Sequence, residues 1–177
     1  ETPYKAKVIG RDALTDSALI QLIDRPNSPL PEAKFGDSAQ MQPGDWVMAI
    51  GNPFGLAHTV SVGVISATAR SFPIAEQRFA DVLQTDAAIN PGNSGGALVD
   101  TDGRLIGINQ SIFSRSGGNN GIGFAIPINM ARNVMDRLVR DGKFTRGFLG
   151  VNIQNVTTDI AKEFKLGDQG GALVGGV

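Results

Sequence analysis

The loop at residues 90–96 contains the residues of this sequence that are best suited to chemistry. It is Asn-Pro-Gly-Asn-Ser-Gly-Gly and lies between two apolar runs. The Ser94 hydroxyl can act as a nucleophile, and the neighbouring glycines keep bulky side chains away from it. Such a loop can also direct backbone N–H groups toward a negatively charged oxygen in a transition state. The predicted donors of this oxyanion hole belong to Gly92, Asn93 and Ser94.

This loop has two other possible roles. The same residue types dominate ordinary turns, so a plain turn between strands is one alternative. A phosphate-binding loop fits poorly, because such loops lead from a strand into a helix and carry a lysine that is missing here.

The whole string from Gly92 to Val99 resembles the nucleophile loop of chymotrypsin-fold serine proteases, specifically those of the HtrA (Deg) family. The resemblance implies an ATP-independent serine endopeptidase that degrades misfolded or unfolded proteins in protein quality control. It also implies a periplasmic or cell-envelope location and a homotrimer or higher oligomer. A catalytically dead, peptide-binding or chaperone-like protein of the same fold is the alternative.

A second candidate residue lies in the turn at residues 11–16, which carries two carboxylates. Either could be an ordinary solvated turn aspartate. The segment from Leu14 to Leu19 resembles the HtrA segment in which the aspartate of the catalytic triad precedes a buried strand, although Ser17 stands where the family more often has leucine. The resemblance implies that Asp16 orients the catalytic imidazole and that Asp12 shapes the turn.

The general base is the difficulty, because His58 is the only histidine. The order Asp16, His58, Ser94 matches that of subtilisins, but their fold alternates strands with long helices and this sequence predicts mainly strands. In chymotrypsin-fold enzymes the histidine precedes the aspartate. We therefore expect the catalytic histidine upstream of Glu1, which makes these residues a fragment that is nearly inactive alone.

Further site residues follow from the same resemblance. It places Gln110, Ser111 and Ile112 at the primary specificity pocket or at the edge that pairs with an extended peptide. No acidic residue occurs at residues 87–89, so a preference for aliphatic residues before the cleaved bond is expected. The loop at residues 114–121 is similar to one that switches between active and inactive arrangements. Phe54 belongs to a segment similar to one beside the HtrA active site.

The fold predicted from the short apolar runs and many glycines is mostly β, a chymotrypsin-like double β-barrel with an incomplete first barrel. We expect a strand pair over 59–68, a bulge or bend at Gly63, and a polar loop over 70–79. A helix should begin at Asn129 as its N-cap and end at Gly142. The Gly-Asp-Ser at residues 36–38 lacks the following glycines, so Ser38 is expected to be structural.

The predicted organisation is the end of the first barrel at 1–25, the second barrel at 26–127, a linking helix at 128–143 and the start of a truncated PDZ domain at 144–177. The stretch from Arg146 to Val151 resembles the opening strand of a PDZ domain, and a short helix should follow over 158–164. The resemblance implies that a peptide C-terminus binds at Phe148, Leu149, Gly150 and Val151.

Composition sets limits on other functions. The 177 residues carry a formal net charge of -1, so nothing indicates a nucleic-acid partner. The sequence has no cysteine, which excludes disulfides, thiol nucleophiles and cysteine-based metal sites. No metal or nucleotide motif is present, and we expect no cofactor.

Overall fold

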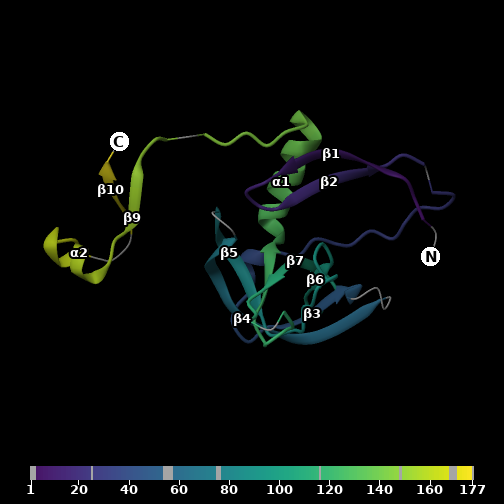
Figure 1. The fold of residues 1–177 in the computed structure, drawn as a ribbon, viewed down its shortest axis with the longest axis horizontal. Helices are drawn as coiled ribbons and strands as arrows, with labels where there is room; N and C mark the ends of the chain where they lie inside the picture. Colours follow the sequence, from purple (N-terminus) through teal and green to yellow (C-terminus); the bar gives the residue numbers. More distant parts are fainter. Residues whose placement is uncertain are drawn as a thin grey trace. The chain divides into compact units, whose positions relative to one another are not determined.

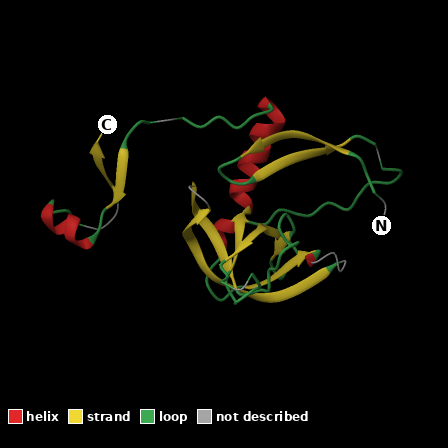
Figure 2. Cartoon of the chain, in the orientation of Figure 1, coloured by secondary structure: helices red, strands yellow, loops and turns green. Residues whose placement is uncertain are grey.

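The computed structural model describes residues 3–24, 26–53, 58–74, 77–115, 117–147, 149–167 and 171–176, with the side chains of 70–74 and 77–80 left aside. The chain divides into two compact units, Glu1–Phe144 and Thr145–Val177 (Figure 1). Strands dominate over helices, as Figure 2 shows. The prediction of a mostly β fold is therefore confirmed.

A closed antiparallel barrel forms the centre of the first unit. Its strands follow one another around the barrel in the order β3-β4-β5-β8-β7-β6, and β6 closes the ring by pairing with β3. The strands are β3 (Trp46–Gly51), β4 (Thr59–Ile74), β5 (Gln77–Thr85), β6 (Ala97–Val99), β7 (Leu105–Ile112) and β8 (Gly123–Pro127).

The barrel core comes from the alternate residues that each strand turns inward. Apolar side chains from all six barrel strands meet there with those of the segment between β5 and β6. This buried cluster consists of Val47, Ala49, Ile65, Leu83, Ala87, Ile89, Leu98, Ile106 and Ala125. Because Ala87 and Ile89 belong to it, the approach to Ser94 is anchored in the core.

A separate two-stranded sheet pairs β1 (Ala6–Asp12) with β2 (Ser17–Leu22). The turn between them is fixed by Asp12, whose carboxylate accepts hydrogen bonds from the Thr15 N–H at 3.3 Å and the Thr15 hydroxyl at 2.5 Å. Asp16 follows with φ at 49°, a left-handed conformation that aspartate tolerates better than most residues. Asp12 thus shapes the turn that presents Asp16. That this sheet is the end of a first barrel stays a prediction.

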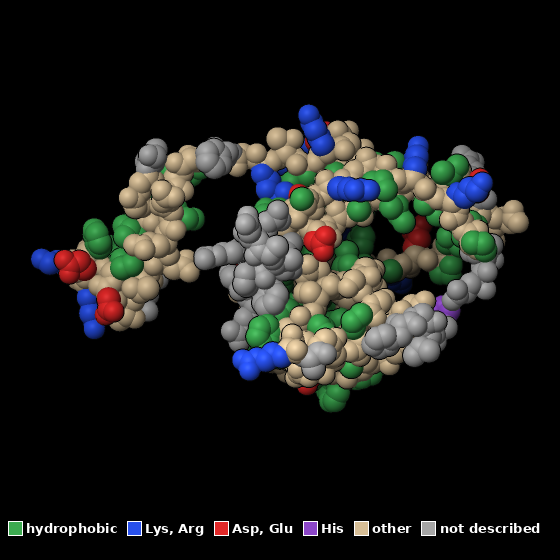
Figure 3. Space-filling model, in the orientation of Figure 1, with side chains coloured by type: hydrophobic (Ala, Val, Ile, Leu, Met, Phe, Trp, Pro, Cys, Tyr) green, Lys and Arg blue, Asp and Glu red, His purple; other side chains and the backbone are tan. Residues whose placement is uncertain are grey.

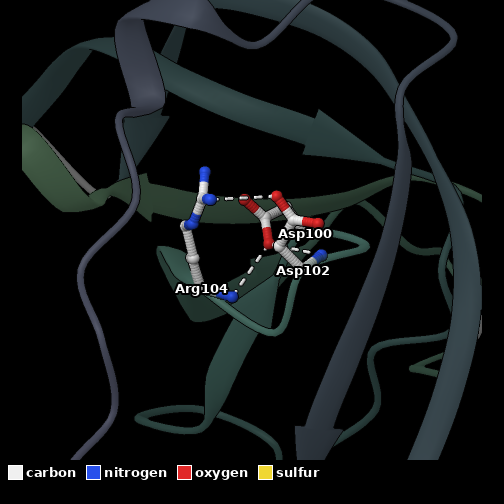
Figure 4. A network of polar contacts seen from close by, with 3 residues as sticks. All are labelled: Asp100, Asp102 and Arg104. Carbon is white, nitrogen blue, oxygen red and sulfur yellow. Dashed lines mark hydrogen bonds and ion pairs between the residues drawn. The ribbon is translucent and has the colours of Figure 1, made fainter.

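The connection from β6 to β7 is a hairpin turn (Figure 4). The Asp100 carboxylate accepts hydrogen bonds from the N–H groups of Asp102 at 2.9 Å and Arg104 at 2.8 Å. Gly103 has φ at 73°, and Arg104 forms an ion pair with Asp102 at 3.1 Å. The turn holds β7 in register beside β6, which begins directly after the loop at residues 90–96.

Helix α1 (Ile128–Asp141) buries Ile128, Ala131, Val134 and Leu138, and Gly142 ends it with φ at 69°. The prediction that Asn129 is its N-cap is wrong. The N-cap residue is Pro127, which makes no side-chain hydrogen bond to the helix. The Asn129 N–H, in the first turn, donates instead to the Ser38 hydroxyl at 3.2 Å. The Asn129 amide donates to Asp37 at 2.7 Å and lowers the pKa of that carboxyl. Ser38, at the start of η1 (Ser38–Gln40), therefore caps a helix distant in sequence.

Two further expectations about the barrel are wrong. The described residues of the expected polar loop, 70–74 and 77–79, are in strands instead, because β4 continues to Ile74 and pairs with β5 from Gln77 onward. Gly63 forms neither bulge nor bend, since it lies in register opposite Val47. A glycine is required there because a Cβ would collide with the backbone nitrogen of Ala87.

The second unit contains β9 (Asn152–Asn155), which pairs antiparallel with β10 (Ala172–Gly176), and α2 (Thr158–Glu163). The Thr157 side chain caps α2 by accepting a hydrogen bond from the Ile160 N–H. The described residues between Arg146 and Val151 are not in a strand, so the expected opening strand begins later, at Asn152. Identification of this unit as the start of a PDZ domain stays a prediction.

Figure 3 shows basic side chains spread over the face in view rather than gathered in one area. This distribution agrees with the near-zero net charge of -1. Within the residues that the structure describes, no helix is long and apolar enough to cross a membrane.

We predict that Ser38→Ala lowers the free energy of unfolding by about 1 kcal/mol, the usual cost of a lost helix cap. Urea unfolding of the full-length protein, followed by tryptophan fluorescence, measures this. Ser28→Ala, at an exposed position, is the control and should stay within about 0.5 kcal/mol of the unaltered protein. Equal losses in the two variants would show that Ser38 caps nothing.

Candidate active site

The segment that leads into the Ser94 loop is tied to β4 by polar contacts. The Thr85 hydroxyl donates to the Val64 carbonyl at 2.8 Å and accepts from the Ala87 N–H at 3.1 Å. The Asp86 carboxylate accepts from the Val64 N–H at 2.7 Å. The Ser61 hydroxyl donates to the Ala88 carbonyl at 2.8 Å. These contacts fix where the loop starts.

The loop itself is a pair of tight turns. The Asn93 N–H donates to the Asn90 carbonyl and the Gly96 N–H donates to the Asn93 carbonyl, both at 2.9 Å. Gly92 and Gly95 have φ at 102° and 85°, a backbone conformation that residues with a side chain rarely adopt. The glycines are therefore required by the backbone path as well as by access to Ser94.

The three predicted oxyanion-hole residues differ in what their amides do. The Asn93 N–H is occupied by the turn, and its side chain is buried against Gly51. Among the described residues, the N–H groups of Gly92 and Ser94 have no hydrogen-bond acceptor. These two N–H groups are thus free to donate, in a loop where Gly92 and Gly95 adopt positive φ.

Ser94 is exposed, and its hydroxyl donates to the Gln110 carbonyl at 2.8 Å. A β-bulge makes this contact possible. Asn109 pairs with Ala125 and Ser111 with Phe124, which leaves Gln110 as the extra residue of β7. Because the bulge takes Gln110 out of the ladder with β8, its carbonyl can accept from the serine.

The side chain of Gln110 extends this contact to Asp16. Its Nε2 donates to Asp16 Oδ2 at 3.4 Å, and its Oε1 accepts from the Ser111 hydroxyl at 3.0 Å. Ser111 therefore orients the amide so that its donor side faces the carboxylate. The structure brings Ser94, Asp16, Gln110 and Ser111 together, and Ile112 is half-buried against the barrel core.

His58 is exposed and lies one residue before β4. Phe54, expected beside the active site, falls outside the described residues, and so does Phe148 of the predicted peptide-binding stretch. In that stretch, Leu149 and Gly150 are exposed and Val151 is half-buried. No group of three or more His, Asp or Glu residues that could hold a metal ion occurs in the described part of the chain.

Sequence reasoning missed two asparagines that support the loop. Asn119 donates from its N–H to Asn90 Oδ1 at 3.0 Å and from its Nδ2 to the Ile89 carbonyl at 3.1 Å. Asn109 lies beneath the loop and is 1% exposed. A polar residue within the otherwise apolar start of β7 was the only signal for Asn109, while Asn119 lies in a stretch of small polar residues with no distinguishing signal.

Comparison with known proteins identifies the family. A sequence profile of the trypsin-like peptidase domain matches residues 1–108. A Chlamydia muridarum protein named "Probable periplasmic serine endoprotease DegP-like" is 54% identical over 171 residues, which cover 97% of this chain and 34% of that protein. A Marinomonas protein of the same name is 48% identical over 171 residues, covering 97% of this chain and 35% of that protein. The chain thus spans about a third of these curated relatives.

Two solved structures have the same fold. "HtrA-type protease AlgW with tripeptide" is 49% identical with a TM-score of 0.85, over 97% of this chain and 56% of that one. "HtrA-type protease AlgW with decapeptide" is 48% identical with a TM-score of 0.81, over 98% of this chain and 52% of that one. These similarities confirm the expected resemblance to HtrA (Deg) proteases and their chymotrypsin-like fold. The chain therefore belongs to the trypsin-like peptidase domain family.

Proposed function

We propose that this chain provides the nucleophile, the oxyanion hole and the orienting carboxylate of an HtrA-type serine endopeptidase that cleaves unfolded or misfolded proteins in quality control. The observation that carries the proposal is the set of contacts at Gln110. One residue of β7 accepts a hydrogen bond from the Ser94 hydroxyl and donates one to Asp16. These are the two side chains that a serine protease needs around its imidazole.

In the proposed reaction, the Ser94 oxygen attacks the carbonyl carbon of the scissile peptide bond and its proton passes to a histidine. The carbonyl oxygen becomes an oxyanion, which the N–H groups of Gly92 and Ser94 stabilise. Asp16 holds the imidazole in the required orientation and stabilises its protonated form. The histidine then protonates the leaving amine, and a water molecule hydrolyses the acyl-enzyme.

We propose that the histidine comes from outside these 177 residues. His58 is the only one within them. A triad in the order Asp16, His58, Ser94 would belong to the subtilisin fold, whereas this chain forms a closed β-barrel. The chain spans about a third of its curated relatives, so a longer protein has room for the base. Without that base we expect the 177 residues to be nearly inactive.

Substrate binding follows from the position of β7. When the Ser94 hydroxyl turns toward an imidazole, the Gln110 carbonyl is freed and can accept a hydrogen bond from a peptide main chain. An extended peptide would dock beside β7, with Ser111 and Ile112 near its side chains. AlgW has been solved with a decapeptide and with a tripeptide, which supports this mode of binding.

The remaining proposals concern the whole protein. The curated relatives are named as periplasmic, and we propose the same location here. The second unit would be the start of a PDZ domain that binds peptide C-termini near residues 148–151, and the protein would assemble as a homotrimer or higher oligomer. Its ATP-independent activity would need no cofactor.

In the full-length protein, we predict that Ser94→Ala abolishes both cleavage of an unfolded protein and labelling by a fluorophosphonate probe. Asp16→Asn should lower kcat by about 10⁴-fold, because the imidazole loses the carboxylate that fixes its tautomer. Ser38→Ala is the matched control and should retain full labelling. An unaltered protein that leaves Ser94 unlabelled would instead favour a catalytically dead peptide-binding protein.

We predict that cleavage sites carry aliphatic residues before the scissile bond. The residues before the nucleophile loop, Ala87, Ala88 and Ile89, offer no counter-charge for lysine or arginine. Mass spectrometry of products from an unfolded protein, or a set of peptides that differ only at this position, would measure the preference. The expected ratio of kcat/KM for valine over lysine is about 10-fold or more. A preference for lysine or arginine would overturn the proposed pocket.

A further inference from the structure

Asn109 occupies an unusual position in the barrel. It lies on β7 directly before Gln110, is 1% exposed, and follows the apolar residues Leu105, Ile106 and Ile108 on the same strand. A buried asparagine loses its hydration, and hydrogen bonds must compensate for that loss. In Asn109 the amide nitrogen has partners, whereas Oδ1 has none among the described residues. The bonds that Asn109 makes therefore indicate why it is there.

The side chain of Asn109 joins two strands where their own pairing stops. The ladder between β3 and β6 consists of Met48 opposite Val99 and Ala49 opposite Leu98. Continued by one residue, this register would bring Ile50 opposite Ala97. At that point the Asn109 amide nitrogen donates to the carbonyls of both Ile50 and Ala97, each at 3.1 Å. The amide thus takes the place of the next rung of the ladder.

The backbone of Asn109 holds the residues just after the nucleophile. Its carbonyl accepts from the Gly95 N–H at 2.8 Å, and its N–H donates to the Gly96 carbonyl at 2.9 Å. Together with the side chain, Asn109 contacts Gly95, Gly96 and Ala97 in succession. Among the described residues, Ser94 itself donates one hydrogen bond, from its hydroxyl to the carbonyl of Gln110, the next residue of β7.

The adjacent glycine leaves little freedom for this arrangement. A Cβ at Gly96 would collide with the Ile50 carbonyl oxygen and lie 2.9 Å from the Asn93 carbonyl oxygen. The loop therefore packs at Gly96 directly against the Ile50 carbonyl, which accepts the hydrogen bond from Asn109. A shift of that carbonyl would move Gly96 and the turn that contains Ser94.

We propose that Asn109 is a positioning residue for the nucleophile loop: its side-chain amide holds the ends of β3 and β6 so that Ser94 and the adjacent free amides keep their geometry. It touches no reacting atom. Its effect on catalysis rests on the proposed function, whereas its effect on the loop does not. A displacement of about 1 Å in a nucleophile can cost about 100-fold in rate.

The experiment compares Asn109→Ala and Asn109→Asp with Ile106→Ala in the full-length protein. Both Asn109 variants remove the two donors, and the second nearly conserves the shape of the side chain. Ile106 is the matched control, because it is a fully buried residue on the same strand and its aliphatic side chain cannot form hydrogen bonds. Measurements are made at a temperature at which each variant is folded by circular dichroism.

Two readouts separate positioning from general stability. In hydrogen–deuterium exchange, the peptide covering residues 90–98 should exchange at least about 10-fold faster in the Asn109 variants, while peptides from β4 and β8 stay unchanged. The rate of fluorophosphonate labelling and kcat should fall about 10- to 100-fold with KM within about 2-fold. Ile106→Ala should change neither the loop exchange nor the labelling rate selectively.

The proposal would be overturned if exchange became equally faster across the whole barrel in the Asn109 variants. It would also be overturned if Ile106→Ala lowered the labelling rate and kcat as much as they do. Failure of both Asn109 variants to fold would overturn it as well, because the residue would then hold the whole barrel rather than the loop. If the unaltered protein is not labelled at Ser94, the proposed function fails, and the exchange measurement alone decides the role of Asn109.

Discussion

The nucleophile loop is irregular backbone, and its polar groups must be satisfied by the strands around it. It begins on contacts with β4 through Thr85 and Asp86 and ends on contacts with β7 through Asn109. The core residues Ala87 and Ile89 lie at its entrance. Hydrogen bonds between these strands and the backbone groups of the loop hold the loop in one conformation. The donors that they leave free, on Gly92 and Ser94, are the ones proposed for catalysis.

The bulge at Gln110 links this loop to the turn that carries Asp16. A regular β7 would commit the Gln110 backbone to the ladder with β8, whereas the bulge removes it from that ladder. Its carbonyl then meets Ser94, and its amide meets Asp16. Asp16 and Ser94 are 78 positions apart in sequence. Gln110 nevertheless contacts both, Ser94 through its carbonyl and Asp16 through its side chain. The site therefore depends on the β6–β7 hairpin keeping its register.

Sequence reasoning predicted the parts of this arrangement that local patterns encode. These parts are the short apolar strands, the end of α1 at Gly142 and the string around Ser94, and all of them depend on neighbouring residues. It failed where partners are distant. The helix cap comes from Ser38 rather than Asn129, and Gly63 is required by the backbone of Ala87 rather than by a bend.

The same limit applies to the site. The string around Ser94 predicted a nucleophile, but not that the Asn93 amide is taken by the turn, nor that Asn109 bridges β3 and β6. These depend on which strands become neighbours, and spacing along the chain does not contain that information. The strand residues 70–74 and 77–79 were missed for a related reason, because the backbone pairing between β4 and β5 outweighs their polar composition.

The central claim is that the amides of Gly92 and Ser94 stabilise an oxyanion formed when Ser94 attacks a peptide carbonyl. A crystal structure of the full-length protein with a peptidyl boronate tests it most directly. The account predicts boron bonded to Ser94 Oγ, with one boronate oxygen within about 3.1 Å of both amide nitrogens. A boronate bonded elsewhere, or one whose oxygens face away from these two amides, would contradict it.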